Sequence, residues 1–258
     1  MYNLVSVVIL NWLRPNNIKN KILPELVECP DIGEIIISHG KESTYFNCFS
    51  KKKKIYNRKD WELNSIFGLS LRFIAGQQAK YNTILFIDDD LIVHPSTISN
   101  MFSIYNKNKP CLVGRFGRNV GNNLTYDSRD VSINTINTPI LLTSLLMFDK
   151  SICDKFFNYS NLISKYVLEN SKPLWNGEDI FISLLGIKLY QKWGILLSNP
   201  KYFPVQRLRT ESDLSVAISQ DSNHCKYRSN LIKLVVKLYN LSSYNLYHSN
   251  NMIKHILK

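Results

Sequence analysis

A run of three aspartates, Asp88-Asp89-Asp90, is the feature of this sequence most able to do chemistry. It comes directly after the apolar segment Thr83–Ile87. Adjacent carboxylates repel one another unless a cation balances their charge. Carboxylate oxygens suit the hard cations Mg²⁺ and Mn²⁺, which proteins commonly hold with one or two carboxylates while substrate phosphates complete the coordination shell. The run therefore predicts a divalent-metal site and a nucleotide-linked substrate.

Other interpretations of the aspartate run remain open. A solvated acidic turn that binds nothing is one, because short motifs also occur by chance. The spacing Asp88-x-Asp90 after a buried strand also resembles the nucleophile motif of haloacid-dehalogenase-like phosphatases, in which the first aspartate attacks phosphorus and the second acts as acid and base. An EF-hand calcium loop is disfavoured because apolar Leu91–Val93 follows where that loop needs further acidic positions.

The first 90 residues alternate short apolar strands with helices. The patterns predict strands at Leu4–Leu10, Glu34–Ile37 and 83–87, and helices from about residue 16 and over 60–79. This order is typical of a doubly wound α/β sheet, whose ligands bind outside the carboxyl ends of the strands. Asn11, His39 and Asp88 all fall at those ends.

The second half of the chain continues with strands and helices. The patterns predict strands over 111–115 and 141–148, and helices over 95–106, 149–170 and 178–190. The stretch 117–123 is rich in Asn and Gly, so we expect a flexible loop there. Glu178 and Asp179 begin the last of these helices. There is no internal repeat or obvious linker, which favours one domain.

Composition bounds the class of protein. The chain has 258 residues, of which 45% are hydrophobic and 20% charged, as in globular proteins. Its net charge of +12 favours an anionic partner such as a nucleotide diphosphate, phosphorylated glycan, nucleic acid or acidic membrane. Five scattered cysteines without a C-x-x-C pair indicate neither a zinc site nor a dense disulfide framework. No apolar run approaches the roughly 20 residues of a membrane span, and no signal peptide is evident, so we expect an intracellular protein, soluble or peripherally membrane-associated.

Several segments, taken in their order along the chain, resemble the GT-A glycosyltransferases. They are Ser6–Pro15 (SVVILNWLRP), Leu85–Asp90 (LFIDDD), Val113–Arg115, Glu178–Ile180, and His224 with Arg228 before a basic helix. Within that fold the chain is most similar to the exostosin-type family, glycosyltransferase family 64, and the likeness covers most of the sequence. It implies an α/β fold with a Rossmann-like nucleotide-binding half, a mixed central sheet and helices on both faces. We expect this domain to span 1–222, with a basic helical extension, 223–258, packed on it.

The resemblance also implies an activity and a cofactor. Members of the family transfer hexosamine units from UDP-sugars with retention of configuration, so we expect metal-dependent transfer to a glycan or glycoconjugate acceptor. Asp90, together with Asp88 through a water molecule, would hold Mn²⁺ or Mg²⁺ against the UDP diphosphate. His224 would either close over the diphosphate or act as a further metal ligand. Asp88 or Asp89 would face the ribose or the donor sugar.

Further residues are predicted to contact the donor. Arg72 would reach the pyrophosphate, since guanidinium forks suit phosphate oxygens; the alternative is an ordinary surface arginine. Asn11 and Arg14 would contact uracil or ribose, with His39 at the neighbouring strand end; for Asn11 and Arg14 the alternative is turn chemistry and packing. Arg228 would bind phosphate.

Asp179 is the predicted catalytic carboxylate, with Glu178 as its substitute. In an inverting enzyme Asp179 would deprotonate the acceptor hydroxyl; in a retaining one it would stabilise the charge on the sugar or orient the acceptor. The family usually has Asp-Asp here, and the Glu-Asp pair is also similar to a large inverting family, so inversion stays an alternative. A further alternative is that the two acids have no catalytic role and only stabilise the N-terminus of the helix.

Two different functions compete with glycosyl transfer. A phosphatase of the haloacid-dehalogenase type needs its aspartate near the start of the domain, whereas two strand and helix units precede Asp88. A basic binding module is suggested by the chain after Asp221, which has no acidic residue. That tail could contact an anionic membrane or polyanion, or simply cover the core with solvated lysines. No motif beyond charge supports nucleic-acid binding. Acceptor recognition is expected in 116–140 and 158–176.

Overall fold

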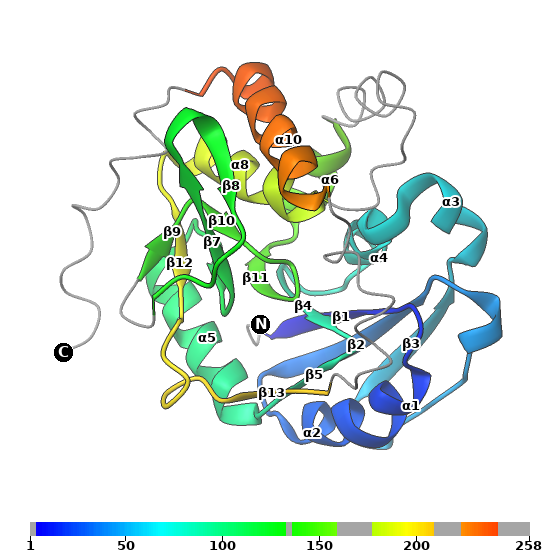
Figure 1. The fold of residues 1–258 in the computed structure, drawn as a ribbon. Helices are drawn as coiled ribbons and strands as arrows, with labels where there is room; N and C mark the ends of the chain where they lie inside the picture. The colour runs from blue at the N-terminus through cyan, green and yellow to red at the C-terminus, as the bar shows by residue number, and fades with distance from the viewer. Residues whose placement is uncertain (1–3, 133–135, 159–176, 209–222, 242–258) are drawn as a thin grey trace.

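A computed structural model describes residues 4–132, 136–158, 177–208 and 223–241 (Figure 1). Its centre is an eight-stranded sheet in the order β3-β2-β1-β4-β11-β6-β12-β9. The strands are β1 Val5–Asn11, β2 Ile32–His39, β3 Lys54–Lys59, β4 Thr83–Asp88, β6 Val113–Gly114, β9 Asn137–Thr138, β11 Leu145–Asp149 and β12 Gly194–Leu196. Strands β1 to β4 pair in parallel, and β11 is antiparallel to both β4 and β6. The predicted mixed sheet with a Rossmann-like first half, as in the GT-A fold, is confirmed.

The register of the parallel half brings the predicted strand ends together. All seven residues of β1 are buried, as expected for a central parallel strand covered on both faces. Leu10 of β1 lies opposite Asp88 of β4, and Asn11 lies opposite His39 of β2. The first aspartate of the run therefore stands at the carboxyl edge of the sheet, beside the chain that leaves β1.

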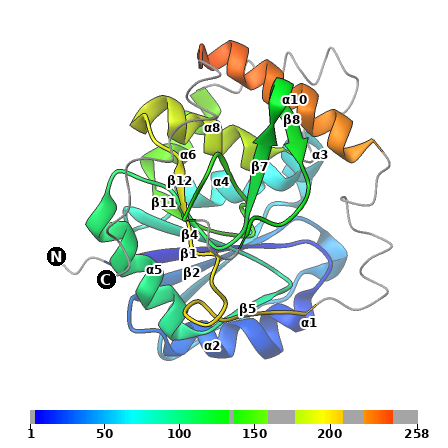
Figure 2. The ribbon, with the colours of Figure 1, turned by 60° about the vertical axis from the view of Figure 1, so that its left-hand side comes forward.

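Helices cover both faces of this sheet, as predicted (Figures 1 and 2). They are α1 Pro15–Asn17, a π-helix at Ile18–Ile22, α2 Leu23–Glu28, α3 Asn64–Phe67, α4 Leu71–Gln77, α5 Pro95–Asn108, α6 Ser151–Asn158, α8 Glu178–Tyr190 and α10 His224–Tyr239. One hydrophobic cluster joins the sheet to α4, α6, α8 and α10, and a second joins the opposite face to α2 and α5. The core thus lies on both sides of the strands, and the site lies at their edge.

Two small sheets flank the carboxyl edge. One consists of β7 Gly117–Gly121, β8 Thr125–Asp127 and β10 Ile140–Leu141; the other pairs β5 Leu91–Val93 with β13 Val205–Arg207. The predicted flexible loop at 117–123 was wrong, because Gly117–Gly121 is a paired strand followed by a 3₁₀ turn. Glycine at 117 permits close approach, since a Cβ there would lie 2.7 Å from the Thr138 side chain. Composition indicated a turn, but partners distant in sequence make a strand.

The predicted helix over 60–79 is broken into short pieces. A 3₁₀ turn at Trp61–Leu63, α3, a second 3₁₀ turn and α4 follow one another, and Gly68 at the break has φ of +48°. This backbone conformation turns α3 out of line with α4. Ile66, which we expected to pack on the sheet, is 67% exposed, whereas Phe73 of α4 is fully buried.

Helix α10 covers the core near α8 and β8 (Figure 2). Its buried side includes Leu231, Ile232 and Val235, while Lys226 and Lys233 face outward. The described part of the basic tail therefore matches the core-covering alternative, and residues 242–258 lie outside the described part. Within the described segments, no helix is both long and apolar enough to cross a membrane.

Candidate functional site

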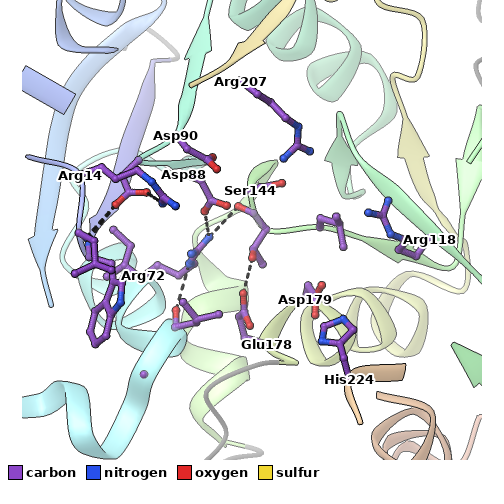
Figure 3. Close-up of a pocket in the computed structure, with 18 of the residues that line it drawn as sticks. Arg14, Arg72, Asp88, Asp90, Arg118, Ser144, Glu178, Asp179, Arg207 and His224 are labelled. Carbon is purple, nitrogen blue, oxygen red and sulfur yellow. Dashed lines mark hydrogen bonds and ion pairs between the residues drawn. The ribbon is translucent and has the colours of Figure 1, made fainter. Parts of the chain in front are cut away.

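A cavity of about 650 Å³ opens at the carboxyl edge of the central sheet (Figure 3). Its walls come from segments far apart in sequence: the chain after β1, the α3–α4 region, the aspartate run after β4, the residues before β11, and the first turns of α8 and α10. Arg118 of β7 and Arg207 of β13 line the remaining wall. The aspartate run and the Glu178-Asp179 pair, predicted separately, therefore share one cavity.

Asp89 holds the loop that follows β1. Its Oδ2 accepts the backbone N–H groups of Trp12 and Leu13 at 3.1 and 3.4 Å, and its Oδ1 pairs with Arg14 at 2.8 Å. Burial raises the pKa of Asp89, and the Arg14 guanidinium partly offsets that rise. Both carboxylate oxygens of Asp89 bond the loop, so this residue has a structural role. Its contact with the ribose or the donor sugar stays a prediction.

Asp88 is paired with an arginine from the floor of the cavity. Nη1 of Arg72 donates to Asp88 Oδ1 at 3.0 Å and to the Thr143 carbonyl at 3.0 Å, and its Nε donates to the Leu69 carbonyl at 3.2 Å. Arg72 is 4% exposed, so the alternative of an ordinary surface arginine was wrong. Burial disfavours its charge, but attraction to Asp88 and Glu178 outweighs burial and raises the pKa of Arg72.

The first turn of α8 presents the late acidic pair. Gly177 precedes it with φ of +142°, and a Cβ there would lie 2.2 Å from Leu231 Cδ2, so only glycine fits this entry into the helix. Glu178 accepts the Thr143 hydroxyl at 2.6 Å and the Gly177 N–H at 3.2 Å. Burial and the neighbouring Asp179 charge raise the pKa of Glu178, opposed by Arg72 and by the Thr143 hydrogen bond.

Asp179 is held by α10. Its Oδ2 forms an ion pair with Arg228, while its Oδ1 accepts the N–H of Ile180 at 2.8 Å. The bond to Ile180 belongs to the alternative in which the acids only stabilise the N-terminus of the helix. The buried ion pair with Arg228 is an additional interaction that this alternative does not require. The Arg228 guanidinium also lies 4.4 Å from the centre of the Tyr126 ring. Attraction to Asp179 outweighs the effect of burial and raises the pKa of Arg228.

The predicted metal ligands are not assembled into a three-ligand site. Among the described residues, no group of three or more His, Cys, Asp or Glu side chains is placed to hold a metal ion. Figure 3 shows His224 on the α8–α10 side of the cavity, away from Asp90. Asp88, Asp90 and His224 therefore do not form such a group among the described residues, and His224 as a ligand stays a prediction. Ligation by Asp88 and Asp90 alone stays a prediction.

Asn11 and His39 do not line the cavity. Both side chains are fully buried, 2.8 Å apart between Asn11 Nδ2 and His39 Nδ1, and Asn11 also donates to the Thr44 carbonyl at 2.9 Å. The rings of Tyr45 and Phe46 pack edge-on against His39 at 4.8 and 5.0 Å. Asn11 and His39 lie at strand ends, as predicted, but the segment after β2 covers them. Their side chains therefore connect β1 to β2 and do not face the cavity. Burial lowers the pKa of His39.

Several cavity residues were missed in the sequence. Arg118 pairs with Asp130 at 2.6 Å, and the Arg207 guanidinium lies 4.3 Å from the centre of the Phe116 ring. Arg118 and Asp130 fall inside 116–140, the range expected to recognise the acceptor, whereas 159–176 lies outside the described residues. Thr143 was missed because nothing local distinguishes it from any other threonine before a strand.

Comparison with known proteins identifies one family. The model of the glycosyl transferase family 64 domain matches residues 5–257. A search of curated proteins found no match. The family match includes β1, the aspartate run, the Glu178-Asp179 pair and Arg228, which together surround the cavity. The chain therefore belongs to glycosyl transferase family 64.

Proposed function

We propose that this protein transfers a sugar from a UDP-sugar to a hydroxyl group of a glycan or glycoconjugate, with Mn²⁺ or Mg²⁺ as cofactor and with retention of configuration. One observation carries the proposal: the Asp88–Asp90 run and the Glu178-Asp179 pair line the same cavity in a chain of family 64. Such a transfer needs a carboxylate cluster that binds the metal ion and its diphosphate on one side of a cavity. It needs a second carboxylate near the sugar on the other side.

The donor set fits a hard divalent cation. Asp88 and Asp90 offer only carboxylate oxygens, and two such ligands suffice where substrate phosphates complete the shell. A cation bound there would neutralise the charge that develops on the leaving diphosphate. Arg72, buried beneath Asp88, adds a fixed positive charge on the same side of the cavity. We infer that the diphosphate lies at this wall.

The environment of Asp179 supports retention. Arg228 is 3% exposed and pairs with Asp179, so the carboxylate is held in one orientation beside a fixed positive charge. Such a group suits stabilisation of positive charge on the sugar, or orientation of the acceptor, better than removal of a proton. Inversion, with Asp179 as general base, is the alternative within the same fold. The wall of Arg118 and Arg207 is the side from which we expect the acceptor to approach.

The other functions have less support. A phosphatase of the haloacid-dehalogenase type needs its aspartate near the start of the domain, whereas β1, β2 and β3 precede the strand that ends at Asp88. A membrane-binding tail needs a free apolar face, whereas the apolar side of the described part of α10 packs on the core. An intracellular location stays a prediction.

The test is release of UDP from a panel of UDP-sugars in the presence of Mn²⁺, Mg²⁺ or a chelator. We expect metal-dependent release from one donor, abolished in Asp90→Ala and reduced at least 100-fold in Asp179→Ala. Asp127→Ala, which removes a carboxylate that pairs with Arg129 and does not line the cavity, should keep full activity. Release from no donor, together with phosphatase activity, would refute the proposal.

A further inference from the structure

We propose that Thr143 is a positioning residue that joins the two carboxylate groups of the site. The inference rests on the proposed function for its kinetic consequences, and on the geometry alone for its effect on Glu178. Thr143 is 4% exposed and lies in the short segment before β11, between the aspartate run and the first turn of α8. Figure 3 shows this segment, labelled at Ser144, between Asp88 and Glu178.

Three hydrogen bonds from two consecutive residues connect the two groups. The Ser144 carbonyl accepts the backbone N–H of Asp88 at 2.9 Å. The Thr143 carbonyl accepts Nη1 of Arg72 at 3.0 Å, from the same nitrogen that donates to Asp88. The Thr143 hydroxyl donates to Glu178 at 2.6 Å. A shift of this segment would therefore displace the end of β4, its arginine and the late acidic pair together.

The hydroxyl has an electrostatic task as well. Glu178 is 3% exposed, and the charged groups around it are Arg72 on α4, Asp179 on α8 and Arg228 on α10. Burial and Asp179 favour the protonated form of Glu178, while Arg72 and the Thr143 hydroxyl favour the ionised form. If Glu178 took up a proton, it would attract Arg72 less and weaken the arrangement beneath Asp88. The Thr143 hydroxyl thus favours the ionised form of Glu178.

The kinetic consequence is a change in pH dependence. Thr143→Val keeps the branched shape and the backbone carbonyl but removes the hydroxyl. Loss of a hydrogen bond to a charged group raises the pKa of Glu178, so the acidic limb of the kcat profile should move to higher pH. At the acidic end of the profile kcat should fall about 3- to 10-fold. UDP binding should stay within about twofold, since the carbonyl that orients Arg72 remains.

Four proteins test this inference: wild type, Thr143→Val, Thr143→Ser and Thr97→Val. Thr143→Ser retains the hydroxyl and should restore the wild-type pH profile. Thr97→Val is the matched control, because it removes an equally buried threonine hydroxyl that donates to Pro204 outside the cavity. It should lower the free energy of unfolding without moving the pH profile. The measurements are kcat against pH at saturating donor, UDP affinity by calorimetry, and thermal unfolding.

A second readout needs no activity. The pKa of Glu178 can be followed by NMR in protein with ¹³C-labelled glutamate carboxyl groups, assigned with Glu178→Gln. We expect a higher pKa in Thr143→Val than in wild type or Thr143→Ser. Equal values would overturn the inference, as would a Thr143→Val enzyme that differs from wild type only in stability. A wild type that releases UDP from no sugar would refute the proposed function instead, and the NMR comparison would still decide the role of Thr143.

Discussion

The buried ion pair between Arg228 and Asp179 gives a sharp prediction for stability. The two side chains are only 3% and 8% exposed, so water screens their interaction weakly. Arg228→Met keeps much of the side-chain volume but leaves the Asp179 charge buried and uncompensated, which costs about 3–5 kcal/mol in comparable pairs. Loss of the contact with the Tyr126 ring adds about 0.5–2 kcal/mol. Against a typical stability of about 5–15 kcal/mol, this is a large share.

A double-mutant cycle separates the pair from its surroundings. Asp179→Asn leaves a buried arginine with a neutral partner, and we expect a loss of similar sign. The double variant removes both charges, so its free energy of unfolding should exceed the additive expectation by at least about 2 kcal/mol. The exposed Arg129, 86% accessible in its pair with Asp127, is the control: Arg129→Met should leave the unfolding midpoint unchanged.

The assay is equilibrium unfolding in urea, followed by the fluorescence of the four tryptophans. Free energies come from linear extrapolation, and the slope should be the same for all variants if they unfold in one step. The reasoning would be refuted if Arg228→Met lost less than about 1 kcal/mol, or if the two single losses simply added in the double variant.

Three further changes test the rest of the site. Gly177→Ala should lower the free energy of unfolding by roughly 2–5 kcal/mol, because an alanine would be strained at this φ and its Cβ would overlap Leu231; a loss below about 1 kcal/mol in urea would contradict this. Arg72→Lys should lower kcat/KM at least tenfold, since one ammonium group cannot hold Asp88 and two carbonyls in the same geometry; a change under threefold would argue against a site role. The pKa of His39 lies below its ordinary 6.5, so the unfolded chain binds more protons, and the stability present at pH 7 falls as the pH drops through 6.5. This group contributes at most about 1.4 kcal/mol per pH unit to that fall. His39→Gln should flatten the dependence of stability on pH, and an unchanged slope would exclude His39 as its source.

Local sequence determined the framework and the position of the main acids. Runs that are mostly Val, Ile, Leu and Phe indicated β1, β2 and β4, because a parallel strand buried on both faces is predominantly apolar. The end of the apolar run at Asp88 placed the aspartates at the edge of the sheet, where ligands bind. The helix that starts at Glu178 was likewise visible, since two acids precede an apolar helical run. Each of these inferences depends on neighbours within a few residues.

Tertiary structure alone decided which of these groups meet and what each one contacts. The sequence left Arg72 either as a pyrophosphate contact or as a surface arginine, and only the packing of α4 buried it beneath Asp88. Asp179 and Arg228 lie 49 positions apart, and only the packing of α10 on α8 makes them a pair.

The errors have the same physical origin. Asn11 and His39 were correctly placed at strand ends, but the residues that follow β2 closed over them. Residues 117–121 have the composition of a loop and become a strand because Ile140 and Leu141 return to pair with them. Backbone propensity and periodicity act over a few residues and can be read in the sequence. Thr44 reaches Asn11 from 33 positions away, and Ile140 of β10 pairs with Arg118 of β7, so these contacts depend on the order of strands and the path of the chain between them.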